Sequence, residues 1–214
     1  MTLEKIKDFL GSGKKSFLPR SRSFRGKGKI FAVPFRRKRQ GRTYYKKRMK
    51  ILLSDKYRFV VRRSLKNFHA SIVEYSSKGD KIIFTVDSKN LAKLGWKGDC
   101  GNLPSAYLVG LLAGKKSVQK GVKEAVLDLG FNNATKGSRL FAVLAGALDA
   151  GLKIPFNPEA LPAKDRISGE HIIKYAQLLK NNTQSYEKQF SNYLKRGLNP
   201  EDLVKHFNEI KGKI

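Results

Sequence analysis

The clearest pattern in the sequence is an alternation of apolar and polar positions in the second quarter of the chain. Phe59 and Val61 fall on one face of an extended segment, and Val60 and Arg62 fall on the other. In a second segment Phe68, Ala70 and Ile72 fall on one face and His69, Ser71 and Val73 on the other, and a KGD turn precedes a third segment. Period-two alternation bounded by turns predicts strands, and short links predict an antiparallel meander. The predicted strands are YRFVVRRSLK (57–66), FHASIVEYSS (68–77) and KIIFTVDS (81–88).

Helical and apolar segments follow the meander. Small and apolar residues from Pro104 to about Lys120 predict a helix that begins near a proline. EAVLDLGF (124–131) is typical of a strand buried on both faces, and SRLFAVLAGALDAG (138–151) predicts a helix capped by Ser138 and closed by Gly151. The fold class predicted is therefore mixed α/β, a mixed sheet with helices packed on its faces. A helical run is also expected at 90–96, a Pro-rich loop at 152–168, and C-terminal helices at 169–180, 183–196 and 200–211.

The N-terminal part of the chain has a different character. Residues 2–10 have the spacing of a short helix, and residues 11–30 mix Gly, Ser, Lys and Arg without periodicity, which predicts disorder until a partner binds. Residues 41–53 predict a short helix whose inward side is expected to carry Tyr44, Tyr45, Met49 and Leu52. The expected organisation is a basic extension (1–29), a basic arm with a short helix (30–54), an α/β core (55–155), and a Pro-rich loop with a helical C-terminal extension (156–214).

Charge changes the picture most. The 214 residues hold 45 Lys and Arg against 17 Asp and Glu, a formal net charge of +28. The first 50 residues alone hold eighteen of these cations and two acids, which marks them as a contact surface. Such a charge predicts a polyanionic partner, and nucleic acid is favoured over an anionic membrane or an acidic protein.

The densest cluster is PFRRKRQGRTYYKKRMK (34–50), in which nine of seventeen residues are Lys or Arg and none is acidic. Arg can place two N–H donors on one phosphate, whereas Lys acts as a point charge. Aromatic side chains interleave with the cations, and such rings can stack on unpaired bases. The segment therefore predicts RNA contact, although a solvated basic face or a nuclear-import tag has the same composition.

Two shorter strings add candidates. The first hairpin carries Arg62, Lys66 and His69, which a sheet surface would present together, although such side chains commonly just face solvent. GWKGDCGN (95–102) has three glycines within seven residues and leads into a predicted helix N-terminus, where an anion can bind. It lacks the spacing of a phosphate-binding or dinucleotide loop, so a structural turn packed on Trp96 is the equal alternative.

Catalysis has little support in the sequence. The three histidines are scattered without metal-ligand spacing, and Cys100 is the only cysteine, so thiol, metal and cofactor chemistry are not expected. Asp87 and Asp128 near strand ends could form a two-metal carboxylate pair, but a strand end and a buried hydrogen-bonded carboxylate are the simpler interpretation. No window is apolar enough to span a bilayer, and the start does not resemble a secretory signal, so a cytoplasmic location is expected.

Four strings, in order, resemble the archaeal and eukaryotic form of the 5S-rRNA-binding protein family of the large ribosomal subunit. They cover about residues 30–180, and the third is the most specific. Cys100 and Leu103 stand where that family commonly has Thr, and Leu65 where it commonly has Asn. The strings are PFRRKRQGRTYYKKRMKIL, FVVRRSLKNFHASIV, LAKLGWKGDCGNLPSAYLVGLLAG and IPFNPEALPAKDRISGEHI.

The resemblance implies a non-enzymatic structural constituent of the large subunit that binds 5S rRNA and helps to anchor it. The implied partners are 5S rRNA, large-subunit rRNA and another 5S-binding ribosomal protein, with no membrane, cofactor, metal or small-molecule substrate. The RNA-binding residues it implies, together with Phe35 of the basic segment, are Arg36, Arg37, Arg39, Arg42, Tyr44, Lys47, Arg48, Arg62, Arg63, Lys66, Trp96, Lys97 and Asn102. Two alternatives stay open at this point: a nucleic-acid enzyme using Asp87 and Asp128, and an interaction protein whose basic arm meets DNA or an acidic partner.

Overall fold

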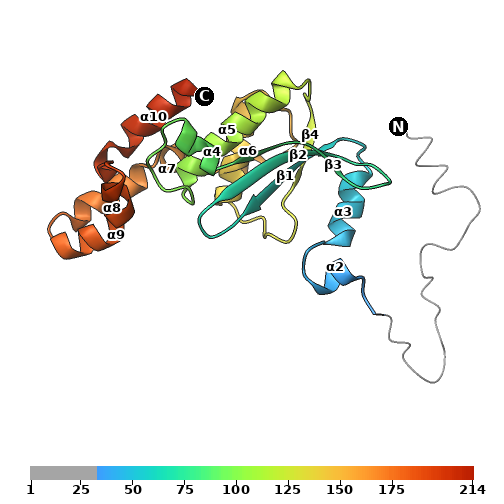
Figure 1. Cartoon of the computed structure of the whole chain (residues 1–214), viewed down its shortest axis with the longest axis horizontal. Coiled ribbons are helices and arrows are strands. Elements are labelled where there is room, and N and C mark those ends of the chain that lie inside the picture. The colour runs from blue at the N-terminus through green and yellow to red at the C-terminus, as the bar shows by residue number, and fades with distance from the viewer. Residues whose placement is uncertain (1–32) are drawn as a thin grey trace, which may run out of the picture. The chain divides into compact units, whose positions relative to one another are not determined.

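The computed structural model describes residues 33–214, so the predicted helix at 2–10 and the predicted disorder at 11–30 lie outside the described residues. The chain divides into two units, Met1–Arg42 and Thr43–Ile214. The described part of the first unit contains one short helix, α2 (Arg36–Arg39). The second unit contains the sheet and the other helices (Figure 1).

The sheet has four strands in the order β3-β2-β1-β4. The first three form the antiparallel meander that the alternation predicted, and the fourth runs parallel to β1, so the sheet is mixed as expected. The strands are β1 (Tyr57–Arg63), β2 (Phe68–Glu74), β3 (Lys81–Asp87) and β4 (Ala125–Asp128).

One face of the sheet forms the core. Phe59 pairs with Ile72 and Val61 with Ala70, and all four side chains are fully buried. Successive side chains of a strand point to opposite faces, so the neighbouring positions, such as the exposed His69, lie on the other face. The predicted division of β1 and β2 into two faces is therefore confirmed.

Helices α5 (Leu103–Gln119) and α6 (Arg139–Asp149) cover the buried face and pack tightly against each other. Glycine permits this approach. A Cβ added at Gly110 would lie 1.9 Å from the carbonyl oxygen of Val143, and one at Gly146 would lie 2.1 Å from that of Tyr107. Both positions are closed to any larger residue unless the helices separate.

The C-terminal extension is helical, as predicted, and α10 packs into the core through Leu203, Phe207 and Ile210. None of the helices among residues 33–214 combines the length and apolar character needed to cross a lipid bilayer. The elements are η1 (Pro158–Ala160), α7 (Lys164–Ser168), α8 (Glu170–Leu179), α9 (Thr183–Lys195), η2 (Pro200–Asp202) and α10 (Leu203–Lys213).

Two local predictions for this half of the chain were wrong. The stretch 152–168 is not wholly extended, because the Asn157 side chain accepts a hydrogen bond from the Glu159 N–H (3.1 Å) and starts η1, and α7 follows. Ser138 occupies the N-cap position of α6, but its side chain makes no capping hydrogen bond.

Two predictions nearer the start also need correction. Helix α3 (Tyr45–Leu52) forms where expected but buries none of its residues, and Met49 is 59% exposed. A helix of eight residues whose main neighbour is the edge strand β4 has little surface to cover its apolar side. The segment 124–131 is not a strand buried on both faces, because β4 spans four residues at the sheet edge and Val126 and Leu127 are only partly buried.

Candidate nucleic-acid interface

The first part of the candidate interface is α2, which consists entirely of basic residues, Arg-Arg-Lys-Arg. No residue of the helix is buried, and Arg36 and Arg39 lie one turn apart, where like charges repel. Arg42 follows after Gly41, whose positive φ of 63° ends the turn, and it is also exposed. Phe35, just before the helix, is 71% exposed. The predicted arm residues of this unit are therefore all on the surface.

Helix α3 belongs to the second unit and carries the remaining arm residues. Lys47 is exposed, and its Nζ lies 5.8 Å from the centre of the Tyr44 ring. That ring meets Phe131 edge-on with 5.7 Å between centroids and stays 43% exposed. Tyr44 was expected to face inward. It instead packs along one edge and leaves much of its ring accessible.

Arg48 is paired with a carboxylate and is only partly exposed. Its Nη2 lies 2.8 Å from Oδ1 of Asp80, and Nη2 of Arg58 lies 2.6 Å from Oδ2 of the same group. Partial burial disfavours the charged form of Asp80, but the hydrogen bonds and charges of the two guanidinium groups outweigh it and hold its pKa below the ordinary value. Arg48 is thus an anchor of α3 to the sheet.

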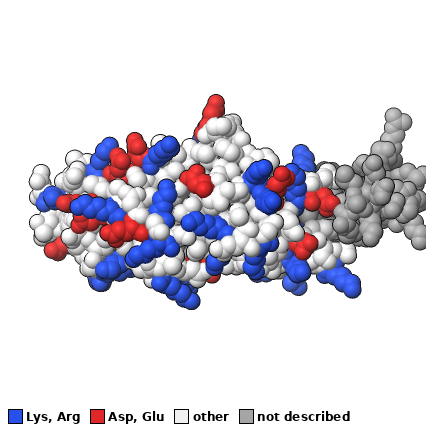
Figure 2. Space-filling view, turned by 90° about the horizontal axis from the view of Figure 1, so that it is seen from above, with Lys and Arg blue, Asp and Glu red and all other residues white. Residues whose placement is uncertain are grey.

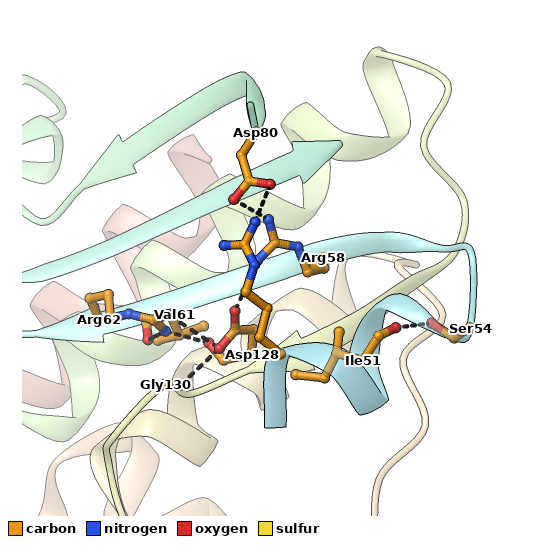
Figure 3. Close-up of polar contacts among 9 residues, drawn as sticks. Ile51, Ser54, Arg58, Val61, Arg62, Asp80, Asp128 and Gly130 are labelled. Carbon is orange, nitrogen blue, oxygen red and sulfur yellow. Dashed lines mark hydrogen bonds and ion pairs between the residues drawn. The ribbon is translucent and has the colours of Figure 1, made fainter. Parts of the chain in front are cut away.

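A second carboxylate continues this network in the sheet. Figure 3 shows Asp128 between Arg58 and Arg62: Arg58 Nη1 lies 3.3 Å from Oδ2, and Arg62 Nη2 lies 3.2 Å from Oδ1. The Arg62 guanidinium also donates to the Asp128 carbonyl (2.6 Å), and the Gly130 N–H donates to Oδ1 (2.8 Å). Asp128 is therefore a buried, hydrogen-bonded link between β1 and β4.

The two-metal carboxylate pair does not form. Asp87 ends β3 and Asp128 ends β4, which are opposite edges of the sheet. Three strand spacings of about 4.8 Å separate them by roughly 14 Å, whereas paired metals sit about 3.5–4 Å apart. Asp87 instead pairs with the Nδ1 of His69. Across the described part of the chain, His, Cys, Asp and Glu side chains nowhere gather in the threes that a metal site needs.

The end of β1 and the loop that follows it present further cations. Arg63 and Lys66 are exposed, and Arg63 makes a long contact of 3.5 Å from its Nε to Oδ1 of Asn132. Arg62 is held by Asp128, as described above, and its side chain is 40% exposed. The hairpin thus has two exposed cations, Arg63 and Lys66, and a third, Arg62, that is paired with Asp128.

The turn at 95–102 is built on Trp96, as the structural interpretation of this string proposed. The indole is 4% exposed and stacks on His206 with centroids 5.2 Å apart. A Cβ on Gly98 would lie 2.5 Å from the indole, so glycine is required there. Asn102 accepts a hydrogen bond from the Ser105 N–H (2.9 Å) and caps α5. Trp96 was predicted to contact RNA, but its buried ring offers no stacking surface, whereas Lys97 is exposed.

The structure brings the hairpin and the turn together in one groove of about 530 Å³. Lys66, Trp96 and Lys97, predicted from separate strings, all line it. Sequence reasoning missed Lys89 at the start of α4 (Lys89–Lys93) and Arg196 after α9, which line it as well. Nothing local in the sequence distinguishes these two from other surface cations, because only the fold makes them neighbours.

Figure 2 shows how charge is distributed on one face of the molecule. Lys and Arg side chains are spread among neutral and acidic ones rather than gathered into one patch. The fold and these surfaces define a basic α/β binding protein.

Comparison with known proteins gives the family. Residues 29–124 and 116–157 match the family described as "Ribosomal large subunit proteins 60S L5, and 50S L18". The chain is also 52% identical over 184 residues to the large ribosomal subunit protein uL18 of Methanococcus maripaludis, an alignment that covers 86% of this chain and 95% of that protein. The chain belongs to this family of large-subunit ribosomal proteins. It is therefore a structural constituent of the large subunit of the cytoplasmic ribosome, associated with rRNA, and not an enzyme.

Proposed function

We propose that the chain binds 5S rRNA within the large ribosomal subunit and helps to anchor it there. Further contacts go to large-subunit rRNA and to another 5S-binding ribosomal protein. The observation that carries the proposal is the basic segment 34–50, which has nine Lys or Arg and no acid, eight of them exposed. Such a segment suits a polyanion, and the resemblance to 5S-binding proteins supports 5S rRNA as that polyanion.

The residues predicted from sequence divide into two roles in this proposal. Exposed cations neutralise phosphates, and each such neutralisation releases counterions, so binding weakens steeply with salt. Phe35 and Tyr44 supply exposed rings for unpaired bases. Direct phosphate contact is assigned to Arg36, Arg37, Arg39, Arg42, Lys47, Arg63, Lys66 and Lys97. A positioning role is assigned to four residues whose side chains already make contacts within the protein: Arg48, Arg62, Trp96 and Asn102.

The remaining alternative is an interaction protein whose basic arm meets DNA or an acidic partner. A competition titration separates the two. Labelled 5S rRNA bound to the full chain at physiological salt is challenged with unlabelled 5S rRNA, an unrelated structured RNA of equal length, duplex DNA or polyglutamate. We expect unlabelled 5S rRNA to compete at concentrations well over tenfold lower than the other three. Equal competition by duplex DNA or polyglutamate would mean that only charge is recognised, and would overturn the proposal.

A further inference from the structure

The turn 95–102 is fastened to the C-terminal helices by three hydrogen bonds. Asn102 Nδ2 donates to the Tyr193 hydroxyl (3.0 Å), Arg196 Nη1 donates to the Gly98 carbonyl (2.7 Å), and the Lys97 N–H donates to Nε2 of His206 (3.1 Å). Two of these bonds hold the backbone of the turn, one from Arg196 at the end of α9 and one from His206 in α10. These helices fall outside residues 29–124 and 116–157, over which the family description matches.

His206 has two functions at this junction. Its ring lies nearly parallel to Trp96, at an angle of 17°, and covers the indole. Because the Lys97 N–H donates to Nε2, that nitrogen carries no proton and acts as an acceptor. The side chain therefore fixes the backbone at Lys97, an exposed residue that lines the groove.

The groove itself is strongly cationic. Lys66, Lys89, Lys97 and Arg196 line it, from the first hairpin, α4, the turn and the end of α9 respectively. Asp99, the one carboxylate among the described residues that line it, accepts a hydrogen bond from the Gly101 N–H (3.2 Å).

Cys100 adds no negative charge to the groove. Burial raises the pKa of its thiol above the ordinary value, so the group is neutral at pH 7. Four cations therefore face one carboxylate in a hollow of about 530 Å³.

Resting on the proposed function, we propose that α9 and α10 complete a phosphate-binding groove for the RNA backbone. Lys66, Lys89, Lys97 and Arg196 neutralise neighbouring phosphates of one strand, and His206 positions the turn that presents Lys97. Four cations from separate elements match a ligand with repeated anionic groups better than a single ion. The site is distinct from the basic segment 34–50, so each can be tested alone.

Lys89 and Lys97 provide the charge test, since neither side chain makes a hydrogen bond to another residue within 33–214. The double variant K89Q/K97Q is compared with K115Q/K123Q, which removes the same charge from two exposed lysines, one in the last turns of α5 and one after that helix. Binding of 5S rRNA to each full-length protein is measured across a salt series. We expect K89Q/K97Q to bind about tenfold or more weakly, with the slope of log K against log salt reduced by about two. Equal affinities and equal salt slopes for the two double variants would overturn the proposal that this groove binds phosphates.

The positioning function of His206 needs a separate variant. H206A removes the acceptor for the Lys97 N–H without removing a cation, so we expect weaker 5S binding with an unchanged salt slope. H206Q, whose amide oxygen can accept the same N–H, should recover part of the affinity. If H206A binds 5S rRNA with the affinity of the parent, the turn does not depend on α10, and the positioning function of His206 is wrong. Failure of the parent chain itself to bind 5S rRNA would instead refute the proposed function, so the two failures are distinguishable.

Discussion

The Arg48 guanidinium lies 2.8 Å from the Asp80 carboxylate, and this ion pair fastens α3 to the turn between β2 and β3. Asp80 in turn pairs with Arg58, which is 4% exposed and reaches Asp128 on the far side. A chain of alternating charges therefore runs from α3 into the sheet. Arg48, one cation of the basic segment, anchors α3 itself.

D80N tests this anchor. The variant leaves the buried Arg58 with Asp128 alone, so we expect the free energy of unfolding to fall by about 2 kcal/mol at pH 7, measured by urea denaturation. Because the folded pKa of Asp80 lies below its unfolded value, its stabilisation is present above about pH 4 and is lost as the pH falls through the folded pKa. The difference between parent and D80N should therefore shrink below pH 4. A constant difference down to pH 2 would show that the carboxylate charge is not the cause.

Gly110 tests the packing of α5 on α6. G110A places a methyl group 1.9 Å from the Val143 carbonyl oxygen, so the helices must separate, and we expect the protein to be destabilised by about 2 kcal/mol or more. The matched control is G212A in α10, where an added Cβ meets nothing within 4 Å. It should stabilise by up to about 1 kcal/mol, because Ala is the better helix former. Similar thermal midpoints for the two variants would contradict the close approach of the helices.

Arg62 and Arg63 are neighbours with different predicted roles. R62A removes two hydrogen bonds to Asp128 and should lower stability by about 1–2 kcal/mol, whereas R63A should leave stability within about 0.5 kcal/mol. For 5S rRNA binding we expect R63A to reduce the salt slope by about one. Urea denaturation and filter binding on the same samples give both quantities. A salt slope for R63A equal to that of the parent, with normal stability, would remove Arg63 from the interface.

Much of the scaffold could be predicted because its signals are local. Phe59 and Val61 fall two residues apart on one face, and successive side chains of a strand point to opposite faces. The position of β4 could not be predicted, because a short apolar run looks alike in a central strand and in an edge strand covered on one side. The exposed side of α3 was also missed, since its orientation depends on Arg48 meeting Asp80, 32 residues away.

The candidate interface was predicted in outline from composition and less well in detail. Arg39 and Lys66, which the sequence names as RNA contacts, are exposed, as charged side chains usually are, and their contact with RNA stays a prediction. Trp96 was named as a contact, yet the fold buries it under His206, a residue 110 positions later in the chain. Arg196 was missed for the same reason. Contacts between distant segments follow from tertiary packing, which no local pattern records.

The central claim is that exposed cations of the segment 34–50 bind the phosphates of 5S rRNA, and its most direct test is a salt titration of binding. R36A/R37A/R39A is compared with the parent and with K115A/K123A/K153A, which removes three exposed cations elsewhere. The account predicts that the first variant alone weakens binding and lowers the salt slope by about three, roughly one for each phosphate that is no longer neutralised. A slope equal to that of the parent in the first variant would contradict it.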